Sequence, residues 1–350
     1  MKMENDLKSM YPEELKQLVE AAGEKSFRSG QLFSWLHEKR VQDYDEMTNL
    51  PAAFRQKLKE KYPLVKLEVA DMRESAIDGT RKYLFALQDG NVIESVWMKY
   101  QHGNSVCISS QVGCRMGCRF CASTLGGLIR SLRASEMLEQ IYQIQRLTGE
   151  RVSNVVIMGT GEPMENYDQV VRFLRLVSMD KGMNISQRSL TVSTCGLVPQ
   201  MRRFAEEGLQ VTLAVSLHAP TDEQRKKMMP VANKYTIEEV IGACRYFTEK
   251  TGRRVTIEYA LAAGENDRES DAVKLAEVLR DLNCHVNLIP INPVKERSYR
   301  RSSKKEVANF QNKLEKCRIN VTIRRRMGSD IDGACGQLRK SFIDNQRNFE

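Results

Sequence analysis

The amino-acid sequence predicts an α/β protein, in which a partial (βα)6 barrel follows a small N-terminal helical domain and a β-hairpin connector. Three observations predict this order. Helix-like periodicity fills the first 62 residues, Asp-Gly turns interrupt the stretch that follows, and from about residue 104 strand-like runs alternate with helix-like ones. The boundaries that we expect are 1–62, 63–103, 104–300 and 301–350, and the last region comprises a basic helix, an edge strand and the loop that carries Cys335.

The first two regions are short and differ in periodicity. Three helix-like stretches cover about residues 13–22, 29–38 and 52–61. From Leu64 to Met98 the runs become short and alternating, and Asp78-Gly79 and Asp89-Gly90 separate them. Asp-Gly between alternating runs is typical of hairpin turns. We therefore expect a small helical module that leads into the main domain through β-hairpins.

The main domain repeats a strand followed by a helix. The candidate strands lie near residues 104–109, 153–158, 189–194, 210–216, 254–261 and 285–290. Strands that are joined through helices form a parallel sheet, and six such units suit an open or partial barrel, with a doubly wound sheet as the alternative. A further strand near 319–325 is expected to pair at the edge.

Composition limits the compartment and the chemistry. No apolar run among the 350 residues approaches the length needed to cross a bilayer, and the first ten residues lack the apolar stretch of a secretory signal, so we expect a cytoplasmic protein with no membrane partner. We also expect a monomer. In a reducing compartment, nine cysteines indicate metal binding or catalysis rather than a disulfide framework.

Positive charge is concentrated near the C-terminus. The net charge is +9, and residues 295–326 hold twelve Lys or Arg against three Asp or Glu. Such a concentration is typical of a surface that binds phosphates of a polyanion, although a solvated helix face would have the same composition.

Three cysteines form the most specific motif. Cys114, Cys118 and Cys121 occur as CxxxCxxC in SSQVGCRMGCRFCAST, directly after the first repeating strand. Most protein-bound cubane clusters have four cysteine ligands, so three would leave one iron open to another ligand. The alternative is structural zinc with Cys107, Cys335 or His218 as fourth ligand. Zinc sites usually contain two pairs of ligands, and the sequence has no second CxxC.

Polar residues and glycines follow the predicted strands, where the ligands of a βα barrel gather. They are Gly161 and Glu162 in MGTGEP, Ser193, Ser216 with Leu217 and His218, and Asn292. Each residue alone is weak evidence for a binding site, since a single histidine, for example, is more often a hydrogen-bonded core residue. Their joint placement at strand ends predicts a binding site.

The cysteine spacing, with Phe120 before the last cysteine, resembles the signature of the radical S-adenosylmethionine (SAM) superfamily. The segments SVCISSQVGC, MGTGEP, VSLHAP and DIDGACGQL together resemble the RlmN family of RNA methyltransferases, which is related to the Cfr enzymes, over residues 90–340. This resemblance implies a barrel of the radical SAM type and a [4Fe-4S] cluster held by the three cysteines. It also implies that the strand-end residues bind SAM, which is cleaved to a 5′-deoxyadenosyl radical.

The resemblance also implies an unusual methyl transfer to carbon 2 of adenine. One SAM methylates Cys335, and the radical from a second SAM abstracts hydrogen from that methyl group. The resulting methylene radical adds to the base and joins enzyme to RNA. Cys107 then releases the product by forming a disulfide bond with Cys335, and Glu94 is the matching base that removes the proton.

The sequence pattern itself says less about Glu94 and Cys107. In VIESVWM, Glu94 shares a strand face with Val92, Val96 and Met98, and desolvation by apolar neighbours suits a carboxylate to proton transfer. A charge that protects an edge strand is the alternative. The pattern around Cys107 alone favours a buried structural thiol.

The partners implied by the resemblance are 23S rRNA, tRNA at the adenine 3′ to the anticodon, and a flavodoxin- or ferredoxin-type electron donor. Two alternatives share the motifs. A Cfr-like enzyme would methylate carbon 8, and a non-catalytic RNA-binding protein would use its iron–sulfur cluster as a redox sensor.

Overall fold

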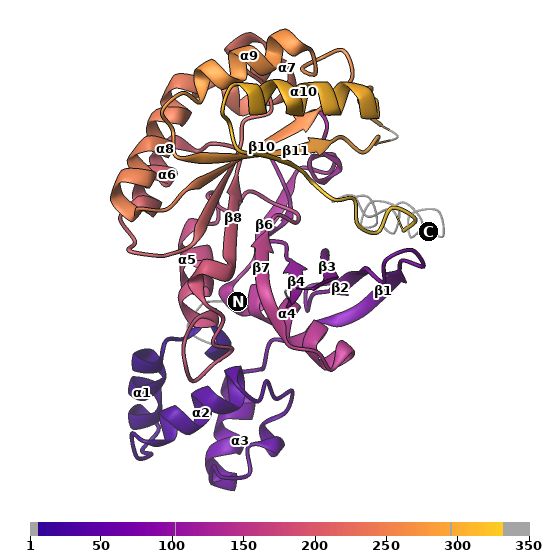
Figure 1. Cartoon of the computed structure of the whole chain (residues 1–350). Coiled ribbons are helices and arrows are strands. Elements are labelled where there is room, and N and C mark those ends of the chain that lie inside the picture. The colour runs from indigo at the N-terminus through magenta and orange to yellow at the C-terminus, as the bar shows by residue number, and fades with distance from the viewer. Residues whose placement is uncertain (1–5, 102, 295, 332–350) are drawn as a thin grey trace.

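The computed structural model describes residues 6–101, 103–294 and 296–331. One ten-stranded sheet runs through the molecule in the order β1-β2-β3-β4-β7-β8-β9-β10-β11-β12 (Figure 1). The N-terminal helices form a lobe of their own at the lower end of the molecule in this view. No helix in the described part of the chain is long and apolar enough to cross a membrane.

The N-terminal lobe confirms the three predicted helical stretches. It contains α1 (Pro12–Ala21), α2 (Arg28–His37) and α3 (Ala52–Lys61), with short 3-10 turns at η2 (Leu7–Ser9) and η3 (Tyr44–Glu46). Polar contacts between buried side chains join it to α4 (Ala134–Thr148). Lys8 Nζ lies 2.8 Å from Glu139 Oε2, and His37 Nδ1 lies 2.7 Å from the Tyr142 hydroxyl.

The connector is antiparallel, as its turn residues predict. The strands β1 (Glu68–Glu74), β2 (Arg81–Ala86) and β3 (Val92–Tyr100) pair in sequence, and the two Asp-Gly turns lie between them. β3 also pairs antiparallel with β4 (Gly103–Cys107), so the connector continues the main sheet.

All six predicted repeating strands are present and parallel. β4 is followed across the sheet by β7 (Val152–Ile157), β8 (Leu190–Thr194), β9 (Thr212–Ser216), β10 (Val255–Leu261) and β11 (Cys284–Pro290). A doubly wound sheet would reverse its strand order at a switch point, whereas these strands keep the order of the chain. The predicted edge strand is β12 (Val321–Ile323), parallel to β11.

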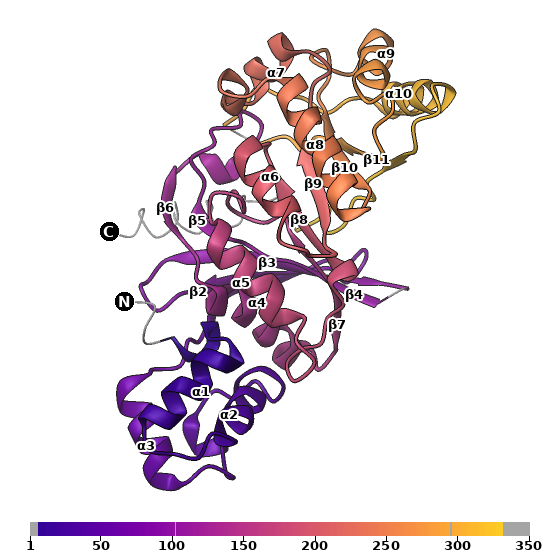
Figure 2. The same cartoon turned by 90° about the vertical axis from the view of Figure 1, so that its left-hand side faces the viewer.

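Helices cover the outer face of the sheet. Figure 2 shows α4, α5 (Tyr167–Val177), α6 (Val198–Ala205) and α8 (Ile237–Thr251) side by side over it. The remaining helices are α7 (Asp222–Met228), α9 (Glu269–Val278) and α10 (Lys304–Lys316), with 3-10 turns at η4 (Ala122–Thr124), η5 (Gln187–Ser189) and η6 (Pro230–Asn233). Their apolar faces and the strands form one large core, so the functional groups are left to the inner face and the strand ends.

One pair of strands was not predicted. β5 (Gln111–Gly113) and β6 (Leu128–Ser131) form a two-stranded antiparallel ribbon at the base of the cysteine loop. Gly113 is required there, because its φ is +77° and a Cβ atom would lie 2.0 Å from the Gly127 carbonyl oxygen. The ribbon thus fixes both ends of the loop that carries the three cysteines.

Candidate active site

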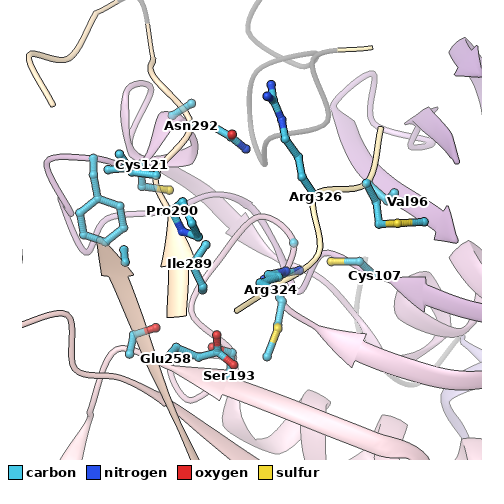
Figure 3. Close-up of a pocket in the computed structure, with 18 of the residues that line it drawn as sticks. Val96, Cys107, Cys121, Ser193, Glu258, Ile289, Pro290, Asn292, Arg324 and Arg326 are labelled. Atoms are coloured by element: carbon cyan, nitrogen blue, oxygen red, sulfur yellow. The ribbon is translucent and has the colours of Figure 1, made fainter. Parts of the chain in front are cut away.

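A cavity of about 330 Å³ opens at the inner face of the barrel. In Figure 3, Cys121 and Asn292 lie on one side of it, Cys107 on the other, and Ser193 with Glu258 at its base. A second cavity of about 190 Å³ adjoins it, and both are lined by Phe120, Cys121, Met158, Gly159, Ser193, Ser216 and His218.

Strand register explains why residues far apart in sequence meet here. Val96 pairs with Cys107 across β3 and β4, and Glu258 pairs with both Ser216 and Asn287 across β9, β10 and β11. Paired residues in neighbouring strands point to the same face of a sheet. Both sets of paired residues therefore lie on the inner face, and the curvature of the barrel brings Val96, Cys107, Ser216 and Glu258 to one cavity.

The second cavity is lined by all three cysteines of the motif. Cys114 follows β5 and donates its amide hydrogen to the Gly127 carbonyl at 2.9 Å, and Cys121 donates to the Cys118 carbonyl at 3.1 Å. The Arg119 amide bonds the Met228 carbonyl at 2.9 Å, which ties the loop to the end of α7. The loop is thus held by backbone hydrogen bonds, and its thiols face one space.

The thiols are suited to a positively charged group. Burial raises the pKa of all three thiols, that of Cys114 to about 12. For Cys114 and Cys118, the negative charge of a neighbouring thiolate of the motif raises the pKa further. Thiolates in such a place need the charge of a metal. Within the described ranges, no three His, Cys, Asp or Glu side chains converge on a single-ion position. In a cubane cluster each thiolate binds a different iron, so this donor set fits a [4Fe-4S] cluster.

The glycine-rich turn after β7 lies against the cysteine loop. Gly161 has φ +116°, and a Cβ atom there would lie 2.7 Å from Gln111 Cβ. The next residue, Glu162, is buried, and its carboxylate oxygens accept the amides of Met164 at 3.0 Å and Cys195 at 2.8 Å. Burial raises its pKa, which these hydrogen bonds oppose. Gly161 and Glu162 both line the second cavity, beside the cysteines.

The other predicted SAM residues divide into two groups. Ser193, Ser216 and His218 line both cavities, and Asn292 lines the larger one. Leu217 lines neither cavity, because its side chain packs in the main hydrophobic core. Its amide donates to the Glu258 carbonyl at 3.1 Å and its carbonyl accepts from Arg225 Nε at 3.2 Å, so only the second lone pair of that carbonyl is left for a ligand.

His218 is held in one orientation. Its Nδ1 accepts the Ala260 amide at 3.0 Å, and its ring meets Phe120 edge-on at 4.9 Å. Burial lowers the pKa of His218 to about 3, so the ring is neutral at pH 7. Because Nδ1 accepts, the proton resides on Nε2, which can donate to a ligand.

Glu94 lies on the inner face with Val96 and Met98, as the alternation predicts, and all three line the large cavity. The apolar surroundings that we expected are incomplete. Lys82, from β2, is fully buried and places its Nζ 3.4 Å from Glu94 Oε2. The carboxylate therefore has a buried cation beside it, a feature that the pattern of a single strand does not show.

Cys107 lines the same cavity and is a free thiol, as are the seven other cysteines in the described part of the chain. Burial raises its pKa, and the positive charge of Arg324 opposes this rise. Cys335 lies outside the described residues. Its expected position and its expected disulfide bond with Cys107 therefore stay predictions.

Sequence reasoning missed one carboxylate that lines the cavity. Glu258 is 4% exposed, and one of its oxygens accepts from Asn287 Nδ2 at 2.9 Å. Burial raises its pKa, against the opposing effect of Arg324. A single carboxylate within the apolar strand VTIEYAL was the available signal.

The basic segment that the sequence predicted as a phosphate-binding surface contributes four arginines to the cavity lining: Arg301, Arg324, Arg325 and Arg326. Four lysines of that segment, Lys304, Lys305, Lys313 and Lys316, lie instead on α10, where Lys313 pairs with Glu269 of α9 at 2.9 Å. The basic segment is therefore divided between an arginine rim at the cavity and a helix packed on the outer layer.

Comparisons with known proteins agree with this arrangement. Residues 108–276 match the family model described as the radical SAM superfamily, and residues 5–64 match the ribosomal RNA large subunit methyltransferase N-terminal domain. A protein of Lachnoclostridium phytofermentans named "Probable dual-specificity RNA methyltransferase RlmN" is 62% identical over 97% of this chain and 95% of its own length. A Clostridium perfringens protein of the same name is 52% identical over 95% of this chain and 96% of its own. The solved structure of a radical SAM methyltransferase from Sphaerobacter thermophilus superposes with a TM-score of 0.91 at 42% identity, covering 95% of this chain and 98% of that one.

Proposed function

The chain belongs to the RlmN family of radical SAM RNA methyltransferases, and we propose that it methylates carbon 2 of an adenine in 23S rRNA and of the adenine 3′ to the tRNA anticodon. One observation carries the proposal. Cys121 of the cluster motif, the thiol Cys107 and the carboxylate Glu94 line a single cavity, although they come from three different elements. A radical SAM enzyme that only generated a radical would need the first of these and not the other two.

Cys114, Cys118 and Cys121 would hold a [4Fe-4S] cluster, and its fourth iron would be open to SAM. When bound and reduced, the cluster would supply the electron that cleaves SAM to methionine and a 5′-deoxyadenosyl radical. Gly161, Glu162, Ser193, Ser216, His218 and Asn292, with the backbone of Leu217, would bind SAM beside it. Support comes from their shared lining of two adjoining cavities.

Cys335 would carry the methyl group. Its thiolate would take a methyl group from one SAM, and the resulting S-methyl group would lose a hydrogen atom to the radical derived from a second SAM. The methylene radical would then form a carbon–carbon bond with carbon 2 of the adenine. Because carbon 2 is not nucleophilic, this radical route explains why a direct methyl donation from SAM would not suffice.

Glu94 and Cys107 would release the product. The adduct radical would first lose its unpaired electron to a one-electron acceptor, a role that the oxidised cluster would supply. The Glu94 carboxylate would then remove the proton from carbon 2, and the Cys107 thiolate would attack the sulfur of Cys335. The carbon–sulfur bond then breaks, the methylene carbon takes up a proton to become the methyl group, and a Cys107–Cys335 disulfide remains. A reductant must reopen that disulfide before the next cycle.

The arginine rim would bind RNA phosphates around an adenine that has left its stack. Its four side chains border the cavity, where their charge would add affinity without reading sequence. The N-terminal helical module, residues 1–62, would act as a second RNA-binding region, with the connector at 63–103 and the barrel at 104–300. The chain would work as a cytoplasmic monomer with a flavodoxin- or ferredoxin-type electron donor.

Anaerobic reconstitution with iron, sulfide and SAM, followed by digestion of protein and RNA, tests the proposal. We expect 2-methyladenosine in the RNA. Cys335→Ala should cleave SAM without methylating RNA, and Cys107→Ala should accumulate a covalent protein–RNA adduct. 8-Methyladenosine would indicate Cfr-like chemistry instead, and a wild-type Cys335 that never gains a methyl group would favour the redox-sensor alternative.

A further inference from the structure

After β12 the chain leaves the barrel and reaches the turn between β1 and β2, some 250 residues away in sequence. The Asp330 carboxylate accepts hydrogen bonds from Ser75 Oγ at 2.6 Å and from the Ala76 amide at 2.9 Å. In return, Asp78 Oδ2 accepts the Gly328 amide at 3.0 Å. We call residues 75–80 together with residues 328–331 the C-terminal clamp.

The turn is preorganised for this contact. The other oxygen of Asp78 accepts the Thr80 amide at 3.0 Å, and the Gly79 amide bonds the Ser75 carbonyl at 3.0 Å. Hydrogen bonds within the turn thus hold the Asp78 acceptor and the backbone of Ser75 in place, which lowers the entropy lost when the C-terminal segment docks.

Close packing accompanies the hydrogen bonds. Ile331 is 8% exposed, and Gly328 lies so close to the turn that an added Cβ atom would be 3.2 Å from Thr80 Cγ2. Gly328 has φ +59°, so it also supplies the left-handed bend that the segment needs here. The contact thus combines polar and apolar parts, unlike the exposed ion pair between Arg81 and Glu74 in the same hairpin.

The clamp limits where Cys335 can go. Cys335 is four residues beyond Ile331, and an extended chain spans at most about 3.6 Å per residue, so their Cα atoms are at most about 14 Å apart. Without the clamp, the preceding anchor is the amide of Arg324, which bonds the Leu288 carbonyl at 2.8 Å. That would lengthen the tether from four to eleven residues. The effective concentration of the Cys335 thiol at the cavity falls roughly as the −3/2 power of tether length, so this lengthening would lower it about five-fold.

Met327, the residue directly before the clamp, lines the cavity. We infer that Asp330, Ser75 and Asp78 are positioning residues, which hold the base of the Cys335 segment beside the cavity so that its thiol reaches both the methyl donor and Cys107. This inference rests on the proposed function, because it assigns a purpose to the clamp through the role of Cys335. The β-hairpin connector then takes part in the reaction by fixing the tether of the methyl carrier.

The test uses the full-length, cluster-loaded enzyme with Asp330→Ala, Asp330→Asn and, as a matched control in the same hairpin, Glu74→Gln. One measurement is the rate at which Cys335 gains a methyl group from SAM, followed by peptide mass. The other needs no SAM: the rate of Cys107–Cys335 disulfide formation under oxidised glutathione, followed by peptide mapping. We expect Asp330→Ala to slow both about five-fold, Asp330→Asn to slow them less because it keeps one acceptor oxygen, and Glu74→Gln to leave them unchanged.

Rates within two-fold of wild type for Asp330→Ala would overturn the inference. If that variant unfolds, the same criterion applies to Asp330→Asn and to Ser75→Ala. Failure of the proposed function can be distinguished from failure of this inference. If the proposed function fails, wild-type Cys335 gains no methyl group, and the rate of disulfide formation still reports whether the clamp positions the thiol. Where wild-type Cys335 does gain a methyl group, slowing of only the disulfide rate would also contradict the inference, which then requires both.

Discussion

Glu94 shows how far a residue's role follows from sequence. Its face of β3 was predicted by alternation, and the cavity lining confirms that orientation. The buried Lys82 beside it could not be predicted, because Lys82 lies opposite Val96 on the next strand and reaches Glu94 diagonally, and the pattern of one strand does not show the register with its neighbour. Glu258 was missed for the same reason: its partners belong to β9, β11 and the segment after β12.

The first prediction concerns Glu94 as the base. Glu94→Gln keeps the shape of the side chain and removes its ability to take a proton, so turnover should fall at least about 100-fold. Quenched reactions analysed on denaturing gels should show a covalent protein–RNA species, because adduct formation precedes proton removal. Glu150→Gln, at an exposed ion pair with Lys99, is the control and should keep wild-type turnover. Wild-type turnover in Glu94→Gln would show that Glu94 is not the base that removes the proton from carbon 2.

At the scale of elements, periodicity predicted the long strands and helices well, and it failed for the shortest ones. β5 and β6 have three and four residues, too few to show alternation, and they are set by the close approach of Gly113 to Gly127. The basic segment was predicted as one surface. In the structure its arginines and its helix separate, because α10 must bury an apolar face against the barrel.

The second prediction tests the turn after β7. Gly161→Ala should lower the free energy of unfolding by about 1–3 kcal/mol, since it combines a left-handed φ with a Cβ atom 2.7 Å from Gln111. Gly242→Ala, inside α8 with no atom nearer than 3.8 Å to the added methyl group, should instead stabilise by about 0.5–1 kcal/mol. Urea unfolding of both variants measures the difference. Equal stabilities would show that the turn relaxes freely.

At the scale of the whole molecule, the N-terminal lobe and the barrel behave as one body joined by buried polar groups. His37 of α2 bonds Tyr142 of α4, and burial, reinforced by the nearby charge of Lys8, lowers the pKa of His37 to about 3. The unfolded chain binds a proton at this residue near pH 6.5, whereas the folded chain does not. The contribution of His37 to the free energy of unfolding is therefore fully present above about pH 6.5, and it is lost as the pH falls towards 3.

The third prediction follows from this loss of stability at low pH. Between pH 6 and 5, the free energy of unfolding of the wild type should fall by about 1.4 kcal/mol per pH unit more than that of His37→Gln. Chemical unfolding at several pH values gives both profiles. Parallel profiles would mean that His37 is protonated in the folded protein, and that the interface is wetter than its burial indicates.

The overall architecture was predictable because strand order follows chain order and each turn of the connector carries its own sequence signal. The junctions between distant segments were not. Neither the docking of the N-terminal lobe on α4 nor the C-terminal clamp leaves a local pattern, since both depend on side chains more than 100 residues apart that meet only after folding.

The most direct test of the central claim is the fate of the methyl hydrogens when SAM carries a trideuterated methyl group. If Cys335 is the methyl carrier, one deuterium passes to 5′-deoxyadenosine when the radical is formed on the S-methyl group. Mass spectrometry should then find 2-methyladenosine with two deuteriums in its methyl group. A methyl group at carbon 2 that keeps all three deuteriums would indicate direct transfer from SAM and would contradict the account.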